Sequence, residues 1–293
     1  MSYRCVFSIL AAIPAIASLI APSSGSDCGL HPLLEHGRPA GSRKSLATLE
    51  KLKVVSYNIR WRGGDDLRSL IELLKNDGEI GGAAILGLQE VDRDKQRTGN
   101  VNTCRLISEA LGHEYVWAAP PAVPAHNTEN PEEETGVAIL SAFPLGEVCR
   151  IVLPHPGPHG RRRVALGATV TIGDERIRVY SVHAETRIPV DEKMGQLGAV
   201  LSDLKDNHTG LKHAIVLGDF NTWEMNAGGR TRKLFAQAGF TTPFNSDPTW
   251  SQFLFRLKLD WIWLRGFRVK SYGIDRKVKL SDHWPLKVEL EPN

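Results

Sequence analysis

Short apolar runs recur along the chain from residue 52 onward, and helical stretches separate only some of them. Runs of this length, bounded by polar residues, are typical of β-strands. The predicted strands are Leu52–Tyr57, Ala83–Leu88, Val137–Leu140, Val164–Ile172, Ile177–Val182, Ala214–Leu217, Leu259–Leu264 and Leu286–Leu290. The clearest helix is expected over Val190–Asn207, where apolar residues recur at three- and four-residue steps and a charged face remains for solvent. The pattern predicts an α/β protein without an internal repeat.

Two of these runs are joined by Gly173-Asp174, a hairpin signal between Val164–Ile172 and Arg176–His183. Hairpins join antiparallel strands, so the sheets are expected to be mixed, which argues against a doubly wound parallel fold. With 293 residues, 42% of them hydrophobic, the chain can bury a large core, and this composition excludes a disordered or fibrous protein. The formal net charge of +3 neither indicates nor excludes a nucleic-acid partner.

The N-terminus has the pattern of a secretory signal peptide, because Arg4 precedes a long uncharged run that ends in small residues. We expect residues 1–23 to be this leader, and an uncleaved anchor is the alternative. The run is shorter than the about 20 residues that a membrane-spanning helix needs. Export to the periplasm or the medium is expected in either case. Residues 24–50 show no period and are expected to be a linker, followed by one domain over residues 51–293.

Three cysteines remain after the leader, Cys28, Cys104 and Cys149, so at least one is unpaired within the chain. Cys104 falls in a predicted helix and Cys149 in a predicted strand, which permits a bridge between them. The spacing resembles neither a zinc knuckle nor a redox C-x-x-C pair. The pairing is therefore left open.

Polar side chains lie at or just beyond the ends of the apolar runs. They are Asn58, Glu90, His183, Asp219, Asn221, Asp260, Asp282 and His283. Each by itself has an ordinary explanation as a turn residue, a solvated charge or a hydrogen-bonded core histidine. Together they supply the carboxylates, imidazoles and amides of a divalent-cation site for phosphoryl chemistry. The chain has no Gly-x-Ser-x-Gly elbow, no glycine-rich phosphate loop and no cysteine placed as a nucleophile.

The strings around these residues resemble, in their order along the chain, the endonuclease/exonuclease/phosphatase family. The strings are Val54–Arg60, Leu88–Asp92, Gly136–Ser141, Val182-His183, Leu217–Thr222, Leu259–Ile262 and Ser281–Leu286. The resemblance covers residues 51–293. It implies a four-layer sandwich, in which two packed mixed β-sheets are flanked by helices, and hydrolysis of phosphoesters with an essential Mg²⁺.

For the metal, the resemblance implies that Glu90 is the main ligand, with Asn58 and Asp282 beside it. Oxygen donors of this kind suit Mg²⁺, which retains several waters and takes few protein ligands. Mn²⁺ is expected to substitute, because it accepts the same donors.

For catalysis, the resemblance implies that Asp260 fixes the tautomer and orientation of His283 through a hydrogen bond. Asp219 with His283 would then activate a water for in-line attack. A second group of residues would contact the phosphoryl group: Asn221 and His183 as donors to its oxygens or the leaving group, Arg163 as the cation, and Glu134 as the residue that orients His183. A solvated loop is the alternative reading for the run Arg161–Arg163.

The substrate is less constrained than the reaction. The basic clusters Arg161–Arg163 and Arg265–Lys279 favour DNA slightly, whereas the aromatic stretch Trp250–Trp263 favours a phospholipid headgroup at an interface. Phe253, Phe255, Leu257 and Leu259 fit the inward face of a strand equally well. An inositol phosphate is a further candidate, and a non-catalytic binding protein is the alternative outside enzymes. No protein partner is inferred, and a monomer is expected.

Overall fold

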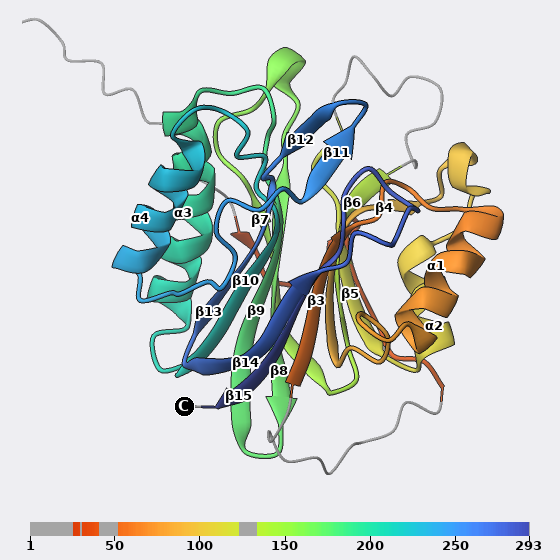
Figure 1. Cartoon of the computed structure of the whole chain (residues 1–293). Coiled ribbons are helices and arrows are strands. Elements are labelled where there is room, and N and C mark those ends of the chain that lie inside the picture. Colours follow the sequence, from red (N-terminus) through yellow and green to blue (C-terminus); the bar gives the residue numbers. More distant parts are fainter. Residues whose placement is uncertain (1–25, 30, 41–51, 123–133, 293) are drawn as a thin grey trace, which may run out of the picture.

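In the computed structural model, the residues described are 26–29, 31–40, 52–122 and 134–292. Two β-sheets pack face to face, and helices cover the outer face of each sheet (Figure 1). The predicted four-layer sandwich of mixed sheets is therefore confirmed. None of the helices in this described part is both long enough and apolar enough to span a membrane.

One sheet has six strands. In spatial order they are β1 (Ser26–Asp27), β7 (Leu145–Val152), β8 (Val164–Ile172), β9 (Glu175–His183), β10 (His213–Asp219) and β13 (Asp260–Arg265). Strands β9 and β10 are parallel, and the other neighbours are antiparallel. The hairpin predicted at Gly173-Asp174 is present as β8–β9.

The other sheet has seven strands. In spatial order they are β14 (Phe267–Ile274), β15 (Leu286–Pro292), β3 (Leu52–Asn58), β4 (Ile85–Arg93), β6 (Glu134–Ser141), β5 (Glu114–Ala118) and β2 (Leu34–Gly37). A separate two-stranded hairpin consists of β11 (Trp250–Gln252) and β12 (Phe255–Leu257). It projects at the end of the molecule where β13 begins (Figure 1).

Alternation along the strands divides the apolar side chains between the layers. On β10, Ile215 and Leu217 enter the core between the two sheets, whereas Ala214 and Val216 pack under the helices. The helices α1 (Gly64–Asn76) and α2 (Thr103–Leu111) cover the seven-stranded sheet. The helices α3 (Val190–Asn207) and α4 (Ala227–Gln237) cover the six-stranded sheet.

Helix α3 has the predicted bounds, but its inner face is more polar than expected. Lys193, Gln196 and Asp203 are buried together with the apolar stripe. Each has a polar partner: the Lys193 ammonium donates to the Asn221 carbonyl, and the Gln196 side chain donates to the Pro154 carbonyl. Buried polar groups are tolerated when hydrogen bonded. Lys193 and Gln196 therefore attach α3 to the loops of the sheet edge, and Asp203 attaches it to Tyr180 of β9.

The segment expected to be a linker is partly structured, which corrects the predicted domain start at residue 51. Strand β1 pairs with β7, and β2 pairs with β5. These two edge strands are short and polar, so they lack the apolar period that marks a strand in the sequence. The predicted leader, residues 1–23, lies outside the described residues.

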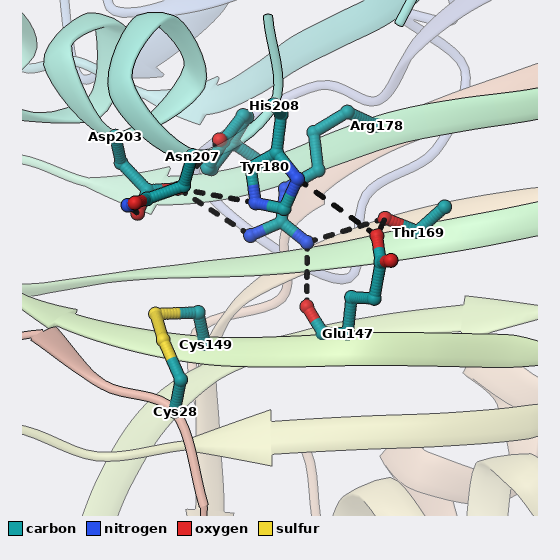
Figure 2. The surroundings of a disulfide bond; sticks show 9 residues. All are labelled: Cys28, Glu147, Cys149, Thr169, Arg178, Tyr180, Asp203, Asn207 and His208. Atoms are coloured by element: carbon teal, nitrogen blue, oxygen red, sulfur yellow. Dashed lines mark hydrogen bonds and ion pairs between the residues drawn. A yellow bond between two sulfur atoms is a disulfide. The ribbon is translucent and has the colours of Figure 1, made fainter. Parts of the chain in front are cut away.

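A disulfide bond joins Cys28 to Cys149 and leaves Cys104 buried as a free thiol. Figure 2 shows the side chain of Arg178 in the surroundings of this bond, among polar groups of the six-stranded sheet and of helix α3. Arg178 is fully buried; it donates to the Glu147 carbonyl at 2.6 Å, and the Tyr180 hydroxyl donates to Asp203 at 2.6 Å. The bridge therefore attaches the N-terminal edge strand to the sheet beside a buried, hydrogen-bonded cluster.

The double variant Cys28→Ser/Cys149→Ser is expected to lose about 2–4 kcal/mol of unfolding free energy, because the bridge closes a loop between residues 121 positions apart. Urea unfolding of the oxidised wild type and the double variant measures the loss. Dithiothreitol should lower the wild-type midpoint and leave the variant unchanged. An unaltered wild-type midpoint under full reduction would contradict the prediction.

Candidate active site

Three strand ends of the six-stranded sheet place the first group of predicted site residues side by side. Parallel pairing aligns Asp219 of β10 with His183 of β9, and antiparallel pairing aligns Asp219 with Asp260 of β13. The imidazole Nε2 of His183 lies 3.7 Å from Asp219 Oδ2. All three residues are buried. A carboxylate at the end of the central strand therefore has an imidazole on one side and a second carboxylate on the other.

The residues around Asp219 hold it at this position. Gly218 adopts a φ of +134°, and a Cβ there would lie 2.0 Å from the Val182 carbonyl oxygen, so only glycine lets β10 approach β9 this closely. Asn221 follows with a φ of +51°, a conformation that asparagine tolerates. Its backbone N–H donates to Asp219 Oδ1 at 3.0 Å, and its side chain donates to the Ala184 carbonyl at 2.9 Å. One N–H of the Asn221 amide is thus already engaged by the loop after His183.

The facing sheet supplies Asn58 and Glu90. Asn58 ends β3, and Glu90 occupies a bulge of β4 with a φ of +56°. The bulge breaks the alternation of β4 and leaves Glu90 partly exposed between buried neighbours. Asn58 Nδ2 lies 3.2 Å from Glu90 Oε1 and 3.1 Å from Asp219 Oδ2. One amide therefore connects carboxylates from both sheets.

His283 reaches the site from the loop between β14 and β15. Its Nδ1 lies 2.9 Å from Asp260 Oδ2, the predicted hydrogen bond, and its Nε2 lies 3.7 Å from Asp219 Oδ2. The Thr249 hydroxyl accepts from the backbone N–H of Asp260 at 2.9 Å, and the Trp284 N–H donates to the Thr249 carbonyl at 2.7 Å. The sequence did not indicate Thr249, yet this one residue links the chain on both sides of the Asp260–His283 pair.

The buried charges at the site interact strongly. Burial raises the pKa of Asp219 to about 6, and the carboxylate of Asp260 acts in the same direction. Burial by itself lowers the pKa of His283, but Asp260 and Asp219 outweigh it and raise this pKa to about 10. At neutral pH, Asp219 is accordingly ionised for the most part, and His283 is an imidazolium between two carboxylates.

His183 is paired with an arginine, whereas a glutamate was predicted. Arg163 Nη1 lies 3.4 Å from His183 Nδ1, and because a guanidinium only donates, Nδ1 is the acceptor and the ring proton is on Nε2. Burial, with Arg163 and His283 nearby, lowers the pKa of His183 well below its usual value, so the ring is neutral. The structure does not bring Glu134 to His183. Glu134 pairs with Arg93, which donates to it at 2.7 Å in the register of β4 and β6.

A glutamate that the sequence reasoning missed organises this edge of the site. Glu185 has no exposed surface and accepts from Arg161 Nε at 3.0 Å and from Arg163 Nε at 3.3 Å. The run Arg161–Arg163 is thus partly fixed by a buried counter-charge. The solvated-loop alternative does not hold for Arg163, whose side chain is 20% exposed, whereas the Arg161 side chain remains 42% exposed. Glu185 follows a strand end, as the predicted residues do. That signal was present, but it did not distinguish Glu185 from a turn residue.

The predicted metal ligands are only partly assembled. Asn58 and Glu90 are together, whereas Asp282 forms an ion pair with Arg60, with 3.0 Å between Arg60 Nη1 and Asp282 Oδ2. Two carboxylates, Glu90 and Asp219, converge on the uncharged Asn58 amide, whose oxygen accepts from the backbone N–H of Arg60 at 3.1 Å. The carboxylates supply hard oxygen donors, the kind that Mg²⁺ and Mn²⁺ accept. Ligand-type atoms of Asp219, Asp260 and His283 also lie within 4.8 Å of one another, but His283 Nδ1 is engaged by Asp260.

Replacing Arg163 with methionine is expected to lower kcat/KM for a phosphoester by about 10- to 100-fold, because the change removes the cation beside the neutral His183. Initial rates with bis(4-nitrophenyl) phosphate measure the effect. Arg162→Met is the matched control, since its neighbours Arg161 and Arg163 are the ones bound to Glu185. Equal losses in both variants would show that Arg163 has no particular role.

Comparisons with known proteins bear on the fold and on the family. No curated protein matches the chain. Among solved structures, an endonuclease/exonuclease/phosphatase from Beutenbergia cavernae is similar with a TM-score of 0.64 and 18% identity, over 83% of this chain and 72% of that one. The human Nocturnin catalytic domain with bound sulfate gives 0.63 and 21%, over 83% and 94%. ANGEL2, a 2′,3′-cyclic phosphatase in complex with adenosine-2′,3′-vanadate, gives 0.60 and 16%, over 82% and 95%.

At these identities the solved structures establish the likeness of fold alone. The family itself is established by a sequence model, described as "Endonuclease/Exonuclease/phosphatase family", which matches residues 55–283. This range begins in β3 and ends at His283, so it includes every predicted site residue that the two sheets bring together. The chain belongs to the endonuclease/exonuclease/phosphatase family.

Proposed function

We propose that this protein is an exported, divalent-metal-dependent hydrolase that cleaves a P–O bond of a phosphodiester with an activated water. The observation that carries the proposal is the arrangement of Asp219 between two imidazoles, each 3.7 Å from its Oδ2. The His183 imidazole is a neutral donor, and the His283 imidazole is a cation. Asp219, the carboxylate between them, is placed to accept a proton. The family is one of phosphoester hydrolases, which supports the reaction class.

Each residue of the group has a role that follows from its protonation. Asp219 accepts the proton of the attacking water, because it is the ionised carboxylate that the Nε2 atoms of both imidazoles face. His283, held by Asp260, stabilises the negative charge that develops as the water is deprotonated. His183, whose proton is on Nε2, donates to a phosphoryl oxygen or the leaving group. Asn221 is proposed to donate its remaining N–H to another phosphoryl oxygen.

The proposed Mg²⁺ would be held by Glu90 and Asn58, and by Asp282 if it exchanges its ion pair with Arg60. A bound divalent ion would polarise the phosphoryl oxygen and neutralise charge on the phosphate. Arg163, fixed by Glu185, would contribute a second positive charge beside His183.

Two molecules are candidates for carrying the phosphodiester, DNA and a lipid headgroup. DNA was favoured slightly by the basic clusters, but the structure divides the cluster Arg265–Lys279. Arg268 and Lys270 of β14 form ion pairs with Glu291 on the neighbouring strand β15. Arg265 is the last residue of β13, and the candidate site lies at the other end of this strand, at Asp260. A lipid headgroup is favoured by the β11–β12 hairpin, where Phe253 and Phe255 are exposed instead of facing inward as a core strand.

A substrate panel tests the proposal. Plasmid DNA, an abasic duplex, sphingomyelin vesicles, an inositol phosphate and bis(4-nitrophenyl) phosphate are each incubated with Mg²⁺, with Mn²⁺ and with chelator. The generic diester is expected to be cleaved with either metal and not with chelator. Absence of turnover on every substrate would favour the non-catalytic alternative. Turnover that persists in chelator would refute the metal dependence.

Export is supported by the disulfide bond between Cys28 and Cys149, because such bonds persist mainly in oxidising compartments. The N-terminal leader pattern points in the same direction. We propose that the protein acts as a monomer, without a dedicated protein partner, in the periplasm or the medium. Fractionation of the producing cells and gel filtration of the purified protein test both statements.

A further inference from the structure

Exposed apolar side chains gather in two segments, one shortly after Asn221 and the other shortly before Asp260. Among the described residues, the large hydrophobic side chains with the most exposed surface are Leu254 at 97%, Phe253 at 93%, Met225 at 87% and Phe255 at 71%. Met225 lies in the loop after Asn221, and the other three form the tip of the β11–β12 hairpin. Apolar residues exposed singly are ordinary, but a contiguous group marks an interaction surface.

The base of the hairpin is attached to the candidate catalytic loop. The Ser251 N–H donates to the Asp282 carbonyl at 2.8 Å, and Trp250 forms an isolated antiparallel β-bridge with His283. Thr249, directly before β11, bonds to both sides of the Asp260–His283 pair. The base is therefore fixed relative to the site, whereas the three side chains of the tip extend away from the protein.

The exposed charges on the hairpin and on the adjacent segment 276–281 are positive, and beside them the exposed carboxylate of Asp247 lies 3.8 Å from Arg276 Nη2. Residues 250–259 and 276–281 contain no acidic side chain. Their exposed charged residues are Arg256, Arg276, Lys277 and Lys279. Arg276 bonds to the Pro248 carbonyl and Ser251 bonds to the loop that follows Lys279, so the two segments are adjacent. An apolar tip flanked by cations complements a surface with an apolar interior and anionic headgroups.

We propose that the tip Phe253–Phe255 inserts into a lipid bilayer that carries anionic phospholipid, with the flanking cations at the headgroups. Single-stranded nucleic acid would also attract the cations, and a base could stack on Phe253 or Phe255, but Leu254, the most exposed of the three tip residues, has no aromatic face. Leu254 gains instead by transfer from water into hydrocarbon. Docking does not require catalysis; combined with the proposed hydrolysis, it brings the site to headgroup phosphodiesters.

Hydrogen–deuterium exchange of the full chain, measured with and without vesicles, tests the proposal. Because exchange is measured for each peptide separately, vesicle binding by the apolar N-terminal run would not obscure the result for the hairpin. With vesicles of phosphatidylcholine and phosphatidylglycerol, the peptide covering residues 250–257 is expected to exchange at least about threefold more slowly than without vesicles. A peptide of β14 should not change. In Phe253→Ser/Leu254→Ser/Phe255→Ser the protection should disappear, and in Tyr272→Ser, an exposed aromatic on β14, it should remain.

Two results would overturn the proposal. One is a wild-type hairpin that vesicles do not protect, or protection that survives in the triple variant. The other is protection by a single-stranded oligonucleotide and not by vesicles, which would assign the tip to nucleic acid. Thermal melting of the triple variant checks folding, and its turnover of the soluble diester should equal that of the wild type. Failure of the proposed hydrolysis would remove that turnover in both proteins and leave the exchange result intact.

Discussion

Asp219→Ala is expected to lose about a thousandfold of kcat on bis(4-nitrophenyl) phosphate. Asp219 is the carboxylate that both imidazoles face at 3.7 Å, so its removal leaves the attacking water without a base and His283 without one of its two counter-charges. Asp219→Asn should lose as much, because it keeps the shape and removes the charge. Initial rates at saturating Mg²⁺ measure both losses.

The loss should not come from unfolding. Burial raises the pKa of Asp219, so ionisation of this carboxylate disfavours the fold, whereas its attraction to the buried His283 imidazolium favours it. Removing the charge changes both effects in opposite directions, so Asp219→Asn should melt close to the wild-type temperature. Asp206→Ala, an exposed aspartate on α3, is the matched control and should retain full activity. An Asp219→Ala protein with more than about a tenth of wild-type kcat would refute the assigned role.

Glu90→Gln is expected to raise the Mg²⁺ concentration needed for half-maximal activity by about 10- to 100-fold. Glu90 presents its carboxylate from the β4 bulge toward Asn58, and the change removes a negative charge without removing packed volume. Titration of activity with Mg²⁺ and with Mn²⁺ gives the shift. Mn²⁺ binding followed by electron paramagnetic resonance gives a readout that does not depend on turnover.

Glu72→Gln, an exposed glutamate on α1, is the control for loss of one negative charge and should leave the metal titration unchanged. A Glu90→Gln protein with the wild-type metal requirement would remove Glu90 from the metal site. In that case the group of Asp219, Asp260 and His283 would become the stronger candidate for the cation.

The sequence by itself determined the elements that have a period. Apolar alternation located the strands that form the centre of both sheets, and the helical stripe gave α3 its bounds, Val190–Asn207. The family strings determined which strand ends carry site residues, and the pairing of Asp260 with His283 followed from them. These features depend on neighbours in the sequence or on short strings, so they can be read without the fold.

Only the tertiary structure decided which charges meet and which apolar side chains are covered. His183 is paired with Arg163 instead of Glu134, and Glu185 holds the arginines, because strand register places these groups together across residues distant in sequence. The edge strand β1 and the Cys28–Cys149 bridge depend on a partner strand as well. Phe253 and Phe255 alternate like core residues but are exposed, because no second layer from the described part of the chain covers the β11–β12 hairpin. A period of two tells which residues share a face of a strand, and packing decides whether that face is buried.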